Sequence, residues 1–133
     1  MRGASALQTV LSESADSPVR AFVVWEPVIA TDIAPPTTAK LRLVHDSRTI
    51  QYWDEGRALS KDIIRAVLAN PSRYSKPAWV DEETIAWDLV LVFPKGVTWR
   101  NDVPVPSYYG GPVVEALSAL RKSIAEQIAK PAE

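Results

Sequence analysis

Residues 19–28 read VRAFVVWEPV, and this stretch decides the predicted fold. The residues Phe22–Trp25 form a continuous apolar run, which is typical of a strand that is covered on both faces. Pro27 has no N–H group to donate to a neighbouring strand, so we expect the strand to end near Glu26. A strand that is covered on both faces needs other helices or strands packed on each side of it. The sequence therefore predicts that this strand lies at the centre of a sheet.

The segments that follow this strand predict a β-α-β unit. Thr31 and Asp32 offer an N-cap for a helix predicted over residues 36–44. A second strand is predicted over residues 48–53 (RTIQYW), and a second helix over residues 58–69, where apolar residues recur on one stripe. The crossover in such a unit is right-handed, and its two strands are parallel.

The rest of the chain predicts a hairpin and a packing helix. Residues 70–83 form a connection that is long for a compact domain, and such connections are often functional. The most apolar strand is predicted over residues 84–93 (TIAWDLVLVF), with residues 97–99 pairing back onto it after a Pro-Lys-Gly turn. The last element is a helix over residues 113–129, whose apolar residues lie on one face.

Composition limits the function classes. The chain has 133 residues, which suits one domain; we expect residues 1–17 to form an arm or a short helix and residues 18–133 to form the domain itself. The 15 Lys and Arg residues against 16 Asp and Glu residues argue against a nucleic-acid binder. We find no apolar run of about 18 residues for a membrane span and no signal-peptide core, so a cytoplasmic location is expected.

The chain contains no cysteine. Disulfide bonds, thiol catalysis and thiolate metal sites all require cysteine, so the sequence excludes them.

The predicted order β-α-β-α-β-β-α resembles the thioredoxin fold over roughly residues 19–129. The residues FVVWEPV at 22–28 fall where thioredoxins carry the strand that leads into their redox turn. The residues LVLVFPKGVTW at 89–99 resemble the thioredoxin hairpin. The chain is also similar to small bacterial proteins of this type, which supply no activity to transfer. The resemblance implies an α/β fold, in which helices flank one mixed sheet.

Two departures separate the chain from thioredoxins. The segment WEPVIATD, at residues 25–32, holds no cysteine where the redox motif would stand. The cis-proline that faces the thioredoxin dithiol would fall at or near Asp88, and no proline stands there. The resemblance therefore implies the fold without the activity. The absence of cysteine excludes thiol–disulfide exchange and thiol peroxidase chemistry whatever the fold.

A tryptophan is followed directly by an acid at three places in the chain. These pairs are Trp25-Glu26, Trp53-Asp54 and Trp87-Asp88. In the predicted fold the first two pairs end parallel strands, and the third begins the antiparallel strand beside them. Since an antiparallel strand begins at the edge where its parallel neighbours end, we expect all three pairs at one rim of the sheet. Ligands of open α/β sheets bind at that rim.

These residue types support several kinds of chemistry. Clustered carboxylates raise at least one carboxyl pKa, which permits general acid–base catalysis, and three carboxylates suffice for a hard divalent ion. Indole faces bind cations and stack on flat ligands. The simpler interpretation is structural: Asp32 and Asp54 cap helices, Asp88 solvates a sheet end, and tryptophans close the core.

Tyr108 and Tyr109 complete the candidate residues. They precede Gly110-Gly111 and the start of the last predicted helix. A loop at this place either binds an anion at the helix N-terminus or merely turns the chain.

Three hypotheses about function follow. The first is a non-redox thioredoxin-like domain that binds a small ligand or a protein partner, with no cofactor and no metal. The second is a small enzyme that uses the rim carboxylates without cysteine. The third is a homo-oligomeric structural protein, with the aromatic loops or a sheet edge as its interface. The residues do not identify a catalytic group, and we expect neither a nucleic acid nor a membrane as partner.

Overall fold

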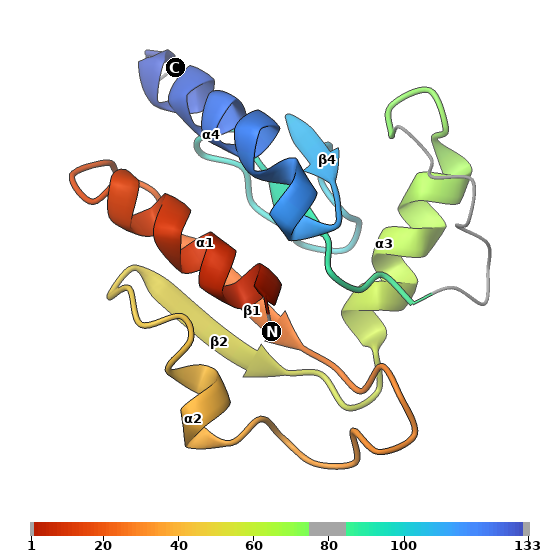
Figure 1. The fold of residues 1–133 in the computed structure, drawn as a ribbon. Coiled ribbons are helices and arrows are strands. Elements are labelled where there is room, and N and C mark those ends of the chain that lie inside the picture. Colours follow the sequence, from red (N-terminus) through yellow and green to blue (C-terminus); the bar gives the residue numbers. More distant parts are fainter. Residues whose placement is uncertain (1, 75–84, 132–133) are drawn as a thin grey trace.

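The computed structural model describes residues 2–74 and 85–131. Within these residues the chain is a mixed α/β protein with four helices and two small sheets (Figure 1). No helix in this part of the chain is long and apolar enough to cross a membrane.

The first sheet pairs β1 (Ala21–Trp25) with β2 (Thr49–Trp53) in parallel, as the predicted β-α-β unit requires. The register places Ala21 opposite Thr49 and Trp25 opposite Trp53, so both strands end at the same level. The connection between the strands carries the short helix α2 (Thr38–Leu41).

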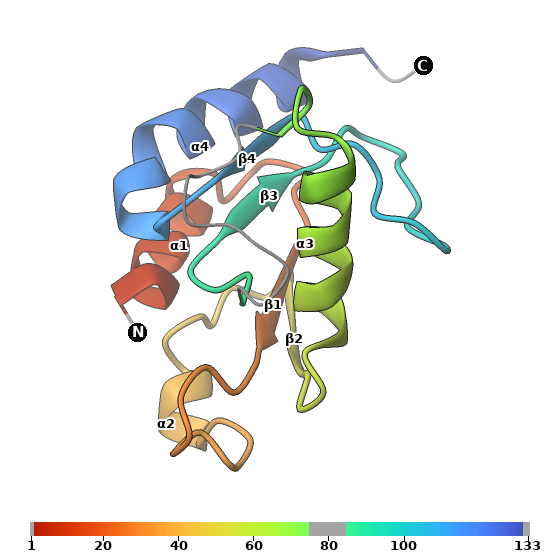
Figure 2. The same cartoon turned by 90° about the vertical axis from the view of Figure 1, so that its right-hand side faces the viewer.

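The second sheet pairs β3 (Val90–Val92) with β4 (Tyr108–Gly110) in the antiparallel direction. The long helix α4 (Val113–Ala129) packs against both strands and against the N-terminal helix α1 (Arg2–Glu13) (Figure 2). The helices α4 and α3 (Ala58–Ala69) begin and end as the apolar periodicity predicts.

The core has two parts. Helix α3 contributes Ile63, Ile64 and Val67 to a cluster with Tyr74, and residues of β3 and β4 pack against this cluster. Helices α1 and α4 contribute Leu11 and Leu120, each with 1% of its surface exposed. Both helices therefore belong to the packed structure of the domain.

The prediction of a central strand covered on both faces is wrong. Among the described residues, strand β1 has one neighbouring strand, β2. The side chain of Phe22 is 59% exposed, and that of Tyr52 across the sheet is 51% exposed. The opposite face is the one that packs: the Trp25 indole N–H donates to Gln51 Oε1 at 2.8 Å, and Gln51 donates to the Leu41 and Val44 carbonyls. A continuous apolar run does not by itself show which of its alternate side chains are covered.

The predicted hairpin is also wrong, although its turn forms. The Val97 N–H donates to the Pro94 carbonyl, and Gly96 has a φ of 79° that suits glycine. Residues 97–99 then form no strand, and Val97 and Trp99 stay exposed. Strand β3 pairs instead with Tyr108–Gly110, and it is shorter than the predicted 84–93 strand, of which Thr84 lies outside the described residues.

Two further predictions also differ from the structure: the helix over residues 36–44 and the loop at Tyr108–Tyr109. The helix is limited to α2, and its N-cap is Thr37, whose hydroxyl accepts from the Lys40 N–H; Thr31 and Asp32 do not cap it. Tyr108 and Tyr109 lie in β4, where they pair with Val92 and Leu91 of β3. Most of the predicted 70–83 connection, residues 75–83, lies outside the described residues.

Candidate functional site

The carboxyl ends of β1 and β2 bring two of the three tryptophan–acid pairs together. Trp25 lies opposite Trp53 in the parallel register, and the Asp54 N–H donates to the Trp25 carbonyl at 2.8 Å. Glu26 and Asp54 are therefore the first residues beyond the sheet on neighbouring strands. The ends of parallel strands are the usual place for ligands in α/β proteins.

Asp54 has a structural role at this end. Its Oδ2 accepts a hydrogen bond from the Leu59 N–H at 2.8 Å, which satisfies one of the free donors in the first turn of α3. The structural interpretation of Asp54 as a helix cap is confirmed.

Glu26 is the most perturbed carboxyl group of the site. Its pKa is raised to about 7, mainly by burial and then by the neighbouring Asp54 charge, while Arg57 and the Ser60 hydroxyl act in the opposite direction. Its Oε2 is buried and has no hydrogen-bond partner among the described residues. About half of the Glu26 carboxyl groups are therefore neutral at pH 7.

The third pair is not joined to the other two. The chain just before it reaches the same region, because the Ala86 N–H donates to the buried Ser60 hydroxyl at the start of α3. Asp88, however, lies against Gly3 of α1, and its carbonyl against Gly111, while Trp87 is 55% exposed. The three acids accordingly form no metal-binding group among the described residues.

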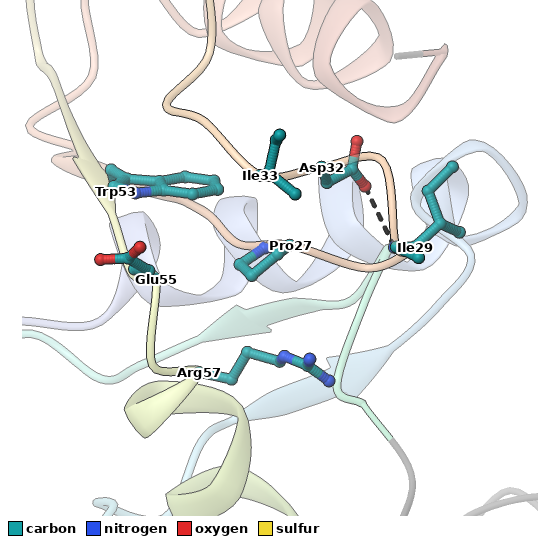
Figure 3. Close-up of a pocket in the computed structure, with 8 residues that line it drawn as sticks. Pro27, Ile29, Asp32, Ile33, Trp53, Glu55 and Arg57 are labelled. Atoms are coloured by element: carbon teal, nitrogen blue, oxygen red, sulfur yellow. Dashed lines mark hydrogen bonds between the residues drawn. The ribbon is translucent and has the colours of Figure 1, made fainter.

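A pocket of about 270 Å³ opens beside Trp53 (Figure 3). The loop after β1, residues 27–33, forms one side of it, and Trp53, Glu55 and Arg57 form the other. Asp32 also lines it, so two of the sequence candidates, Asp32 and Trp53, meet there.

The lining residues differ in how they are held. Asp32 Oδ2 accepts from the Ile29 and Val28 N–H groups, each at 3.2 Å, and these bonds lower the pKa of Asp32. This pairing closes the 28–32 turn and shapes the loop side of the pocket. Ile33 is 83% exposed, which leaves its side chain free to contact a ligand.

Three other candidates serve the packing of the domain. Trp25 is fixed by Gln51 on the covered face of the first sheet. Tyr109 meets Tyr74 edge-on, with 5.5 Å between the ring centroids, and burial raises the pKa of Tyr109. Tyr108 lies beside it in β4.

Sequence reasoning missed Arg57 as a pocket residue. It stands in the turn Asp54-Glu55-Gly56-Arg57 between β2 and α3, with φ 55° and ψ 37°, a left-handed conformation that is uncommon for arginine. The sequence did place a cationic residue in the short turn between a predicted strand and a predicted helix. The left-handed backbone conformation of that residue cannot be inferred from the sequence.

Comparisons of the chain with protein-family models, with curated proteins and with solved structures found no match.

Replacement of Glu26 by Gln is expected to stabilise the protein at pH 8 and not at pH 4.5. The folded-state pKa lies near 7 and the unfolded value near 4.5. Native Glu26 therefore costs stability as the pH rises from about 4.5 to 7, and this cost stays constant above 7. The gain at pH 8 is about 1–2 kcal/mol after a discount for partial solvent exposure. Urea unfolding of both proteins at the two pH values measures it.

Glu55→Gln is the matched control, because it removes the same charge from an exposed side chain nearby. A Glu26→Gln variant whose stability relative to the native protein does not change with pH would contradict the assignment.

Proposed function

We propose that the protein is a non-redox, thioredoxin-like domain that binds a small ligand in the pocket at the carboxyl ends of β1 and β2. The observation that carries the proposal is the position of this pocket. It lies where parallel strands end, and it combines an indole and exposed isoleucines with charged side chains of both signs, Arg57, Asp32 and Glu55. Small-molecule sites usually combine apolar side chains with a few polar groups that orient the ligand.

The thioredoxin-like part of the proposal is supported by the order and direction of the elements. From β1 onward they follow the order β-α-β-α-β-β-α, with a parallel first pair and an antiparallel second pair. Helix α4 packs on the second pair. A thioredoxin-like sheet would also join the two pairs side by side, whereas here they are separate two-stranded sheets.

A second candidate function is acid–base catalysis by Glu26. Its raised pKa and its unpartnered oxygen favour that function. Two observations favour binding instead: Glu26 is not among the residues that line the pocket, and Asp54, its neighbour, is engaged in capping α3.

One observation favours the hypothesis that the protein binds a protein partner instead of a small ligand. The outer face of the first sheet exposes Phe22, Ile50 and Tyr52, and the Phe22 and Tyr52 rings stack at 6.5 Å. Exposed apolar clusters often mark interaction sites. The same face would serve a second copy of the chain.

The proposal is tested by NMR titration of the ¹⁵N-labelled protein with a set of neutral, anionic and cationic aromatic compounds. We expect at least one compound to shift the amide signals of residues 29–33 and 53–57 together. The variant Ile33→Arg should abolish that response, because it places a bulky charge in the pocket through an exposed side chain.

Val97→Arg is the matched control, since it adds the same side chain at an exposed position outside the pocket. If no compound in the set shifts the pocket signals, or if Ile33→Arg binds as the native protein does, the pocket is not a ligand site.

A further inference from the structure

Arg57 is a charged pocket residue that forms no ion pair with another described residue. The ion pairs within the described residues involve Arg48, Arg65, Arg121 and Lys122. A guanidinium has five N–H donors and no acceptor, so within this part of the chain Arg57 remains available to an acceptor on a ligand.

Two of the acids near Arg57 are engaged by other groups. Asp54 caps α3 through Leu59, and Asp32 accepts two N–H groups of its own turn. The raised pKa of Glu26, about 7, leaves about half of this carboxyl group neutral at pH 7. Because Asp54 and Asp32 satisfy other groups, these two carboxylates compete less for the guanidinium.

The left-handed backbone at Arg57 is the second observation. A residue with a side chain rarely adopts this conformation unless the surrounding structure imposes it, and such residues cluster at binding sites. The preceding Gly56 would adopt the conformation more readily, but it stands one position away. Here the conformation holds Arg57 in the pocket lining.

Figure 3 shows Trp53 and Ile33 on one side of Pro27 and Arg57 on the other. In this view, a ligand that contacts both the indole and the guanidinium passes over Pro27. An apolar body joined by a short linker to its charged group fits such a path.

We propose that the pocket takes a monocarboxylate with an aromatic or apolar body, whose carboxylate pairs with Arg57 while its body lies against Trp53, Pro27 and Ile33. The inference rests on the proposed ligand-binding function. Arginine matches the two oxygens of a carboxylate with two parallel N–H donors.

The remaining charges of the pocket restrict the ligand to one negative charge. Asp32 and Glu55 line the pocket together with Arg57, so the lining carries two acids and one base. A single carboxylate beside Arg57 is compensated, whereas a phosphate dianion would bring its second charge near these acids. Like charges at close range disfavour binding.

Four ligands that share a phenyl ring test the inference. They are 3-phenylpropionate, its neutral amide, the cation phenethylamine, and the dianion phenyl phosphate. We expect 3-phenylpropionate to bind about ten-fold more tightly than the amide, which is the effect of one charge-assisted contact. Phenethylamine and phenyl phosphate should bind more weakly than 3-phenylpropionate. Dissociation constants come from the NMR shifts of residues 53–57.

The variant Arg57→Gln should reduce the affinity for 3-phenylpropionate to that of the amide and leave the amide unchanged. The control Lys61→Gln removes an equal charge from the next turn of α3, where Lys61 bonds to the Gly56 carbonyl outside the pocket. It should bind 3-phenylpropionate as the native protein does. Should Arg57→Gln fail to fold, the ratio between 3-phenylpropionate and its amide on the native protein still decides.

The possible outcomes distinguish a failure of the monocarboxylate inference from a failure of the proposed ligand-binding function. Equal affinity for 3-phenylpropionate and its amide, or tighter binding of phenethylamine or phenyl phosphate, overturns the monocarboxylate assignment while the pocket remains a ligand site. If no ligand of any charge shifts the pocket signals, the proposed function fails as well.

Discussion

Replacement of Leu120 by Ala is expected to lower the free energy of unfolding by about 2–5 kcal/mol. Leu120 is 1% exposed and lies in α4, the helix that packs against α1, β3 and β4. The truncation removes buried methyl groups and leaves a cavity that rigid neighbouring elements cannot fill completely. Much of the total stability of a domain of this size would be lost. Urea or guanidinium unfolding, followed by circular dichroism, measures the change.

Val114→Ala is the matched control on the same helix. Val114 is 38% exposed, so its truncation should change the free energy of unfolding by about 0.5 kcal/mol or less. Comparable losses for the two variants would mean that α4 presents a different face to the domain from the one described.

The second large effect is expected at Arg48. Its guanidinium donates to the carbonyls of Leu11 and Ser14, both at 2.6 Å, and of Ser17 at 3.0 Å. It also pairs with Asp46, with 2.7 Å between Arg48 NH2 and Asp46 Oδ2. The carbonyls at the C-terminal end of a helix have no partners within the helix, so Arg48 fastens the end of α1 to the start of β2.

The variant Arg48→Met keeps the apolar stem and removes all these donors. We expect the melting temperature to fall by about 10 °C, since three partly buried carbonyls and one carboxylate lose their charged guanidinium donors together and keep only their other hydrogen bonds. Differential scanning calorimetry measures it. Arg65→Met is the control: Arg65 is 75% exposed and pairs with Asp62 on the surface of α3, where ion pairs contribute little.

The same pair gives a pH signature. Hydrogen bonds from Arg48 lower the pKa of Asp46 to about 2 from its ordinary value of 3.8. The pair therefore contributes its full stability above pH 3.8 and loses it as the pH falls towards 2. In Arg48→Met this dependence should be reduced but not absent, because the backbone N–H of residue 48 still donates to Asp46 Oδ1. A variant that melts like the native protein at pH 7 would show that the contacts of α1 with α4 and the Gln8 hydrogen bonds to residues 45 and 46 hold α1 without Arg48.

The residue pattern by itself determined the parts of the fold that depend on local regularity. Helices α3 and α4 follow from an apolar stripe that must be buried, and their ends follow from Asn70-Pro71 and Gly110-Gly111-Pro112. The parallel pairing of β1 with β2 follows from two strands joined by a crossover. Because the two strands are parallel and in register, Trp25-Glu26 lies next to Trp53-Asp54. The absence of cysteine from the sequence excluded thiol chemistry.

Only the tertiary structure decided which short segment pairs with β3. Residues 97–99 and 108–110 both carry β-formers, and the first segment is closer in sequence. The second segment pairs because Tyr109 packs against Tyr74 beneath α3, and because Gly111 lets the chain pass against the Asp88 carbonyl, where a Cβ would clash. Contacts with distant segments, which local propensity does not contain, thus outweigh proximity in sequence.

The site depends on tertiary structure for the same reason. The raised pKa of Glu26 requires burial beside Asp54, and Arg57 becomes a pocket residue through a left-handed backbone and the loop that carries Pro27. The apolar run at Phe22–Trp25 could not show that its outer face is left exposed. Periodicity reports which residues share a face, but burial and charge environment are set by what the rest of the chain places against that face.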